Sequence, residues 1–312
     1  MTLVKRSHWS KSTVPVRPQT ILTRSEVMRQ LGAFSFVLPY LVAFALFLAY
    51  PMVYGIFISL HHWNPMVGAG GFVGLGQYAL LFNFHDLATQ TFWQSIGNTS
   101  LFVLISVPFL VAVPLILAYL IYLAPAKGLF RPVFFFPAIL SATSVMAIWA
   151  WMLQTEGGPI NGFLGLHVPW LVRQPWAWVS IDLVTVWWSI GFNLIILYAG
   201  MTQLAQTTFD AAAIDGAGLV RIFWSIIIPQ LRNVLSVVLI LSTIASFNLF
   251  AQPFLLTGGG PANSTLSISQ QIYNQGFGLA HMGSATAMAF FMGLILAAVS
   301  FVQYTFVRQR GA

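Results

Sequence analysis

Residues 207–218 read Thr207-Thr208-Phe209-Asp210-Ala211-Ala212-Ala213-Ile214-Asp215-Gly216-Ala217-Gly218, and long apolar runs flank this segment on both sides. We expect Thr207 to cap a helix through its hydroxyl, with Asp210 closing a weak capping box. The three alanines favour a helix, and Gly216 tolerates the positive φ of a C-terminal turn. A polar helix and turn between two apolar runs predicts an element that a partner outside the membrane holds.

The composition predicts that lipid surrounds most of this chain. Of its 312 residues, 58% are hydrophobic and 6% are charged, whereas soluble domains carry about 25% charged residues. A bilayer core needs about 20 apolar residues per helix, and membrane strands would show alternation that is absent here. The sequence therefore predicts an all-α membrane protein with six transmembrane helices. The six runs are Leu31–Leu60, Ile96–Tyr122, Val133–Leu153, Trp176–Gly200, Asn233–Leu256 and Ser284–Val307.

The chain is expected to divide into a short tail and one membrane domain. Residues 1–30 are polar and basic, which predicts a cytoplasmic tail and an interfacial helix near Arg24–Arg29. Residues 31–312 then form the six-span domain, and residues 207–218 are its polar helix. The first apolar run has no short core with a small-residue cleavage site, so we do not interpret it as a signal peptide.

The basic residues predict the orientation of the chain. With six spans, twelve of the thirteen fall on one side, which the positive-inside rule assigns to the cytoplasm. These twelve are Lys5, Arg6, Lys11, Arg17, Arg24, Arg29, Lys127, Arg131, Arg221, Arg232, Arg308 and Arg310, and Arg173 lies opposite. Both termini and residues 207–218 are therefore expected in the cytoplasm. The net charge of +7 is spread over four segments, which does not favour nucleic-acid binding.

Catalytic and metal chemistry find no support in the residues. The chain has no cysteine, and its six carboxylates form no convincing acid–base pair, so we expect no catalytic residue and no enzyme activity. His61 and His62 are adjacent and should point apart, which argues against a metal site. Residues 68–76 are glycine-rich but lack a lysine-serine pair, so turn structure is expected there. Asp182 is expected at the start of span four, with Arg173 as a candidate partner.

Polar residues within the spans predict a cavity. Thr185, Trp188, Ser189 and Phe192 follow helical spacing and share one face of span four, with Asn193 beside it. Asn248 and Gln252 lie one helical turn apart on span five, while Ser141 and Thr143 follow Pro137 on span three, where a broken helix could expose carbonyls. Aromatic rings with amides and hydroxyls suit a sugar. The alternative is that these side chains bridge helices.

Several of these motifs resemble one family. Asp210 to Gly218 is similar to the cytoplasmic "EAA" loop of the membrane permeases of binding-protein-dependent ABC importers, although Asp210 stands where that family usually has glutamate. Gly71 to Tyr78, Phe92 to Thr99 and Leu256 to Asn263 resemble segments of the carbohydrate branch, and the last is similar to the maltose- and glycerol-phosphate-type subunit. The resemblance covers about residues 31–308.

The resemblance implies a type I ABC importer permease, the first of a heterodimeric pair, in a bacterial or archaeal cytoplasmic membrane. A second permease, an ATPase dimer that holds ATP and Mg, and an extracytoplasmic solute-binding protein would complete the transporter, so no cofactor is expected in this chain. The residues implied in coupling to the ATPase are Asp210, Ala211, Ala212, Asp215, Gly216 and Ala217. The residues implied in substrate binding are Thr185, Trp188, Ser189, Asn248 and Gln252, and Asn193 is added as a candidate because it lies beside the polar face of span four.

Three alternatives to a sugar importer would each require different residues inside the spans. No lysine or arginine lies inside a predicted span, which favours a neutral sugar or oligosaccharide over glycerol 3-phosphate or a related phosphodiester. A secondary transporter driven by protons would need a buried titrating group, and the span interiors offer none. A purely structural subunit would not need the polar residues of a cavity. A sugar importer remains the leading hypothesis.

Overall fold

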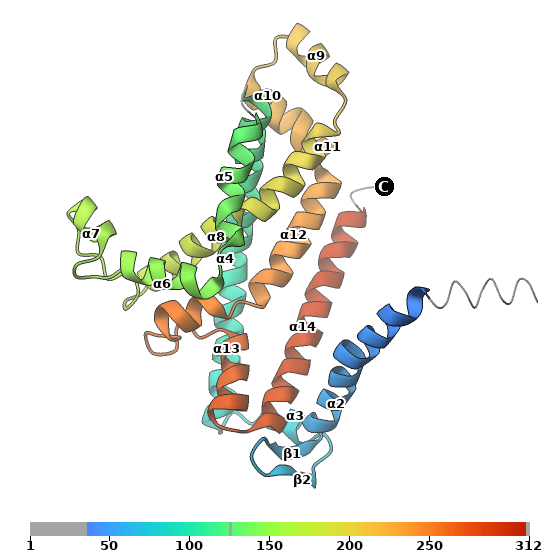
Figure 1. Ribbon diagram of the computed structural model, residues 1–312, viewed down its shortest axis with the longest axis vertical. Helices are drawn as coiled ribbons and strands as arrows, with labels where there is room; N and C mark the ends of the chain where they lie inside the picture. The colour runs from blue at the N-terminus through green and yellow to red at the C-terminus, as the bar shows by residue number, and fades with distance from the viewer. Residues whose placement is uncertain (1–35, 125–126, 310–312) are drawn as a thin grey trace, which may run out of the picture. The chain divides into compact units, whose positions relative to one another are not determined.

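The computed structural model describes residues 36–124 and 127–309, and its helices and strands carry the labels of Figure 1. The chain divides into two units, residues 1–54 and residues 55–312. The tail and interfacial helix predicted for residues 1–30 lie outside the described residues.

The described part of the first unit is helical. Phe36–Ser59 is one apolar helix of 24 residues that contains the π-helical turn η1 (Ala45–Ala49) and α2 (Tyr50–Ser59). The boundary between the units falls within α2, after Tyr54. At a rise of 1.5 Å per residue this helix is about 36 Å long, enough to cross a bilayer core of about 30 Å.

A small hairpin follows α2 in the second unit, where the sequence predicted only turns. β1 (His61–Asn64) pairs antiparallel with β2 (Gly68–Phe72), with an irregular register between His61 and Trp63. The Asn64 side chain accepts from Met66 N at 2.8 Å, a local bond that starts the connecting turn. The glycine-rich β2 has little strand propensity, so the pairing was not visible in the sequence.

Long helices confirm the predicted all-α membrane fold class. Three further unbroken helices are apolar and long enough to cross a membrane, namely α4 (Leu87–Leu123), α8 (Trp176–Thr202) and α14 (Met282–Gln309). Two bent helix pairs pass the same test when each pair is joined, which gives four to six candidate spans in the described chain.

The first bent pair replaces a continuous third span. α5 (Lys127–Ile139) and α6 (Ala142–Met152) meet at 101°. The break falls after Pro137, as the sequence suggested, and Ser141 caps α6 by accepting from Ser144 N at 3.2 Å. Proline removes a helical amide and clashes with the preceding turn, which weakens α5 near this point, and α5 ends two residues later at Ile139.

The second bent pair corrects the prediction for span five. The segment Leu219–Gln230 meets α12 (Arg232–Phe247) at 76°, and α12 ends before Asn248 instead of running to Leu256. Pro253 cannot donate to the carbonyl four residues earlier, which disfavours a continuous helix there. Residues 219–230 comprise α10 (Leu219–Ile222), η2 (Phe223–Ile227) and α11 (Ile228–Gln230).

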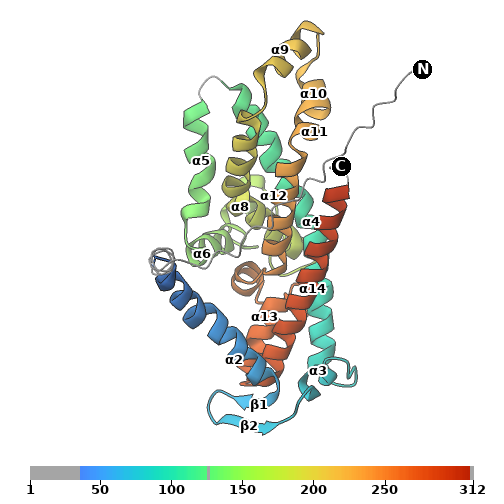
Figure 2. The same ribbon diagram turned by 90° about the vertical axis from the view of Figure 1, so that its right-hand side faces the viewer.

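Short helices connect the long ones. Within the second unit, Figure 1 and Figure 2 show α9 at one end of the long helices and the hairpin at the other, which we call the α9 end and the hairpin end. The short helices are α3 (Gly76–Leu80), α7 (Pro159–Leu164), α9 (Gln206–Ile214), η3 (Pro253–Thr257), α13 (Ile268–Tyr273) and η4 (Asn274–Gly278).

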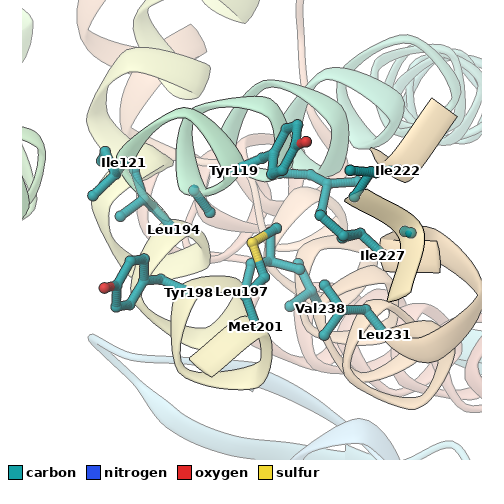
Figure 3. Packing of buried hydrophobic residues seen from close by; sticks show 13 residues of the cluster. Tyr119, Ile121, Leu194, Leu197, Tyr198, Met201, Ile222, Ile227, Leu231 and Val238 are labelled. Atoms are coloured by element: carbon teal, nitrogen blue, oxygen red, sulfur yellow. The ribbon is translucent and has the colours of Figure 1, made fainter. Parts of the chain in front are cut away.

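A hydrophobic cluster packs the α9 end. Side chains of α4, α8 and the helices after α9 meet there, as Figure 3 shows for Tyr119, Leu197 and Ile227. Ala212 of α9 belongs to this cluster, with Phe209 packed against it. One face of α9 therefore packs against the hydrophobic cluster.

Helices α5 and α8 approach each other closely at Gly191. A Cβ at this position would lie 2.6 Å from both Phe134 O and Phe135 Cα, closer than such atoms pack. Only glycine lets the two backbones touch here, as small residues do at helix crossings in membranes.

Candidate functional site

A cavity of about 500 Å³ lies between α8 and the end of α12, and all six residues predicted for substrate binding lie on its wall. α8 contributes one face at helical spacing, and residues of α12 and the break after it form the opposite side. The six predicted residues are Thr185, Trp188, Ser189, Asn193, Asn248 and Gln252. The remaining lining residues are Leu110, Ala138, Phe192, Leu241, Ser242, Ala245, Ser246, Leu249, Phe250 and Ala251.

The end of α12 brings polar groups to the cavity. Asn248 is the C-terminal cap of α12, and its amide donates to Ile244 O at 2.8 Å. Gln252 lies beyond the break, immediately before η3, and is buried. The sequence had suggested that these two residues lie one turn apart on a single helix. They do not lie on one continuous helix, yet both line the cavity wall.

Asn193 joins three helices beside the cavity. Its amide nitrogen donates to Leu110 O of α4 at 2.8 Å and to Ser242 Oγ of α12 at 3.0 Å. In a regular helix, Leu110 O would accept from residue 114, but Pro114 has no amide hydrogen. Asn193 satisfies the carbonyl that this proline leaves free, so helix bridging accounts for its amide nitrogen.

Two buried polar atoms on the wall have no hydrogen-bond partner within the described chain. They are Trp188 Nε1 and Ser246 Oγ. Buried polar groups in native proteins are nearly always hydrogen-bonded, and an unpaired one needs an explanation. Both atoms are almost closed to solvent, so a ligand that accepts hydrogen bonds would reach them only when the wall side chains around them move.

The cavity wall carries no charge. Among the described residues that line it there is no Asp, Glu, Lys, Arg or His. The nearest carboxylate along α8, that of Asp182, accepts a hydrogen bond from Ser106 of α4. This contact replaces the suggested pairing with Arg173 and lies between α4 and α8, outside the cavity lining.

The polar segment at the α9 end forms two short helices joined by a sharp turn, as predicted. Gly216 has φ +70°, and Ala217 N donates to Ala212 O at 2.9 Å. This six-to-one bond is that of a Schellman cap, in which glycine occupies the left-handed position. The turn therefore fixes the direction in which the chain leaves α9.

The N-terminal end of α9 differs from the predicted capping box. The helix begins at Gln206, one residue before the predicted start, so Thr207 lies inside the first turn instead of capping it. Gln206 Nε2 donates to Asp210 Oδ1 at 3.2 Å, an i,i+4 pair on the helix surface. This pair takes up the carboxylate that the capping box would have used.

The six predicted coupling residues divide between two faces. Asp210, Ala211, Asp215 and Gly216 are exposed, while Ala212 is only 8% exposed and Ala217 is half-buried against the same cluster. Beside the exposed group, Ile214 is 86% exposed.

Metal chemistry remains unsupported in residues 36–124 and 127–309, where no group of three or more His, Cys, Asp or Glu side chains could hold an ion. His61 contacts Phe57 O through Nδ1, whereas His62 Nδ1 contacts Gln77 Nε2. The two histidines thus point to different partners, as their adjacency predicted.

Comparison with known proteins decides the family. The family model described as "Binding-protein-dependent transport system inner membrane component" matches residues 87–310. The chain belongs to this family. It is a permease subunit of an ABC importer that works with a binding protein, and in such importers a separate subunit binds ATP.

Curated relatives align with the permease over most of its length. It is 30% identical over 300 residues to the lactose transport system permease protein LacF of Rhizobium radiobacter, covering 92% of this chain and 98% of the relative. It is 30% identical over 287 residues to the multiple sugar-binding transport system permease protein MsmF of Streptococcus mutans, covering 90% and 97%. The family resemblance seen in the sequence is confirmed.

A solved structure shares the fold of the permease. It is the crystal structure of a bacterial ABC transporter involved in the import of the acidic polysaccharide alginate, with a TM-score of 0.78 and 21% sequence identity. The match covers 91% of the permease and 98% of that chain. The predicted importer permease fold is thereby confirmed.

Sequence reasoning missed two features of the permease. Ser246 lies one turn after Ser242 on α12, so helical spacing could have placed it on the cavity wall, but a lone serine in a span usually bridges helices. The exposure of Ile214 could not be read from the sequence, because an apolar residue in an amphipathic helix normally faces the core.

Proposed function

We propose that this permease imports a neutral sugar or oligosaccharide, and that α9 couples its movement to an ATPase. The sugar would occupy the cavity between α8 and α12 and pass through it as access alternates between the two sides of the membrane. A second permease would close the cavity, an ATPase dimer would bind the α9 end, and an extracytoplasmic solute-binding protein would deliver the sugar.

The cavity wall is the observation that carries this proposal. Trp188 and Phe250 offer aromatic rings to the apolar faces of a sugar, and Asn248 and Gln252 offer amides to its hydroxyls. When the wall side chains move on loading, the buried unpaired atoms of Trp188 and Ser246 would donate to sugar oxygens. A phosphorylated substrate usually requires a cation or a helix N-terminus, and the wall offers no cation.

The relatives support a carbohydrate as the substrate class. LacF and MsmF are described as lactose and multiple-sugar permeases, and NgcF of Streptomyces coelicolor, 31% identical over 284 residues, belongs to a diacetylchitobiose uptake system. A second solved structure of the same fold holds a periplasmic protein bound to an alginate pentasaccharide. All of these descriptions name a sugar or a sugar polymer.

Charge supports a cytoplasmic position for the α9 end. Arg221 lies in α10 and Arg232 begins α12, and α5 begins at the same end with Lys127. The positive-inside rule assigns these segments, and with them both termini, to the cytoplasm. The exposed face of α9, with Asp210 and Ile214, would then contact the ATPase.

The direct test is ATP hydrolysis by the purified complex with its binding protein. We expect a neutral mono- or oligosaccharide from a screened panel to stimulate ATP hydrolysis, and sn-glycerol 3-phosphate to leave it unchanged. Stimulation by glycerol 3-phosphate alone would assign the cavity to a phosphorylated substrate. Uptake that continues without the ATPase subunit would reject the importer mechanism.

Substitution of the two unpaired donors tests the cavity itself. Trp188→Phe and Ser246→Ala should each raise the KM for sugar uptake about fivefold, because a net hydrogen bond contributes about 1 kcal/mol. Neither change removes a hydrogen bond from the unliganded protein, so the thermal midpoint of Ser246→Ala should stay level or rise. Trp188→Phe also removes ring atoms packed against a buried cluster, so its thermal midpoint should fall slightly. Uptake assays and thermal melts of each variant would measure both effects.

The neighbouring tryptophan provides a matched control. Trp187 packs edge-to-face on Trp149 at 5.5 Å and is not part of the cavity lining, so Trp187→Phe should leave the KM unchanged. An equal rise in KM for Trp187→Phe and Trp188→Phe would contradict a role for the cavity wall in binding.

A further inference from the structure

Two tyrosines near the end of α4 contact the segment that runs from α9 through η2, residues 206–227, which we call the α9 segment. One tyrosine contacts α9 and the other contacts α10 and η2. Tyr122 lies 5.7 Å from the Phe209 ring, and its hydroxyl donates to Gln206 Oε1 of α9 at 3.4 Å. Tyr119 lies 5.2 Å from the Phe223 ring, and its hydroxyl donates to Leu219 O at 3.0 Å. One helix therefore contacts the chain both before and after the turn at Gly216.

The attachment is firm at Tyr119 and looser at Tyr122, whose hydrogen bond is long and exposed. Tyr119 and Tyr122 are three residues apart, so they lie on one face of α4. Tyr119 is only 7% exposed and belongs to the cluster that also contains Ala212 and Ile222. The cap at Gly216 ties the two halves to each other. A displacement of α9 would thus be transferred to α4 from both sides of the turn.

The same helix reaches the cavity. Leu110 lies nine residues before Tyr119, about 13.5 Å along the helix axis. Its carbonyl accepts the hydrogen bond from Asn193, which also bonds Ser242. All three of these residues line the cavity. α4 is therefore hydrogen-bonded to the α9 segment through Tyr119 and Tyr122, and to the cavity wall through Leu110 O.

We propose that Tyr119 and Tyr122 are positioning residues that transmit the movement of the α9 segment through α4 to the cavity wall. This inference rests on the proposed importer function, in which an ATPase moves α9. The tyrosines touch neither the sugar nor ATP. Their role is to keep α4, α9 and α10 moving together during the transport cycle.

The cysteine-free chain permits a test that needs no identified sugar. In the complete complex in proteoliposomes, a cysteine replacing the exposed wall residue Ala245 can be labelled by a membrane-impermeant maleimide from the hairpin side. Labelling of this chain is compared with and without ATP and vanadate, and the ATP hydrolysis rate is measured in parallel. The readout is the change in labelling for a given rate of hydrolysis.

The conservative substitutions keep both rings and remove only the hydroxyls. Tyr119→Phe should lower the ATP-dependent change in labelling, at a given hydrolysis rate, about fivefold, and Tyr119→Phe with Tyr122→Phe at least about tenfold. Tyr78→Phe is the matched control, since it removes a tyrosine hydroxyl that donates to Ser59 Oγ at 2.9 Å at the hairpin end. It should behave as the wild type.

The outcomes separate the two proposals. If wild-type labelling does not respond to ATP, the proposed importer function fails, and the transmission role fails with it. If the wild type responds and the double variant responds equally for the same hydrolysis rate, the transmission role alone is overturned. A loss of response that only parallels a loss of assembled complex would overturn it too, because a structural role predicts that result.

Discussion

Replacing Gly216 by valine should lower uptake at least about tenfold and weaken the retention of the ATPase, while the permease still inserts in the membrane. Gly216 has φ +70°, and a residue with a Cβ pays about 1–2 kcal/mol in this left-handed conformation, a β-branched one more. Such a cost shifts an equilibrium by a factor of about 5–30. The turn would open and the exposed face of α9 would change direction. Uptake and co-purified ATPase are the measurements.

Two substitutions at the same turn serve as controls. Gly218 has φ −70°, and a Cβ there would meet nothing within 4 Å, so Gly218→Ala should leave uptake unchanged. Gly216→Asn should retain most of the activity, because asparagine tolerates the left-handed conformation. If Gly216→Val and Gly218→Ala were equally active, the direction of α9 would not matter for transport.

Replacing Asn193 by leucine should destabilise the permease by about 1–3 kcal/mol, the cost of leaving a buried polar group unpaired. Leu110 O would lose its partner inside the membrane, because Pro114 offers it no amide hydrogen. The thermal midpoint of the purified complex should fall by several degrees, and uptake should fall with it.

A second substitution, at Pro114, tests whether Asn193 acts through the carbonyl of Leu110. Pro114→Ala restores an amide hydrogen that can bond Leu110 O within α4, so Asn193→Leu should cost much less in that background. The difference between the two backgrounds measures the coupling between the two positions. An equal cost in both would show that Asn193 does not act through the carbonyl that Pro114 leaves free.

The sequence predicted those features that depend on local chemistry. The C-terminal turn of α9 was visible because a left-handed position strongly favours glycine. The cavity face of α8 was visible because α8 is an unbroken helix, on which spacing alone decides that Thr185, Trp188 and Ser189 share a face. Apolar run lengths were enough to predict the membrane fold class.

Features that depend on three-dimensional neighbours were not visible. Hydropathy measures composition, so it could not show that α12 ends before Asn248 and that the chain then bends. The unpaired state of Ser246 Oγ depends on every atom around it. The predicted start of α9 was wrong by one residue, because the helix includes Gln206, whose side chain donates to Asp210.

The contact at Gly191 limits which parts of the permease can move past one another. With the α5 backbone resting directly on α8, no side chain separates them that could change rotamer and let one helix slide along the other. α5 and α8 should therefore travel as a single rigid body. In the proposed transport cycle we therefore expect the hinges to lie elsewhere, at the breaks around Ser141 and Asn248.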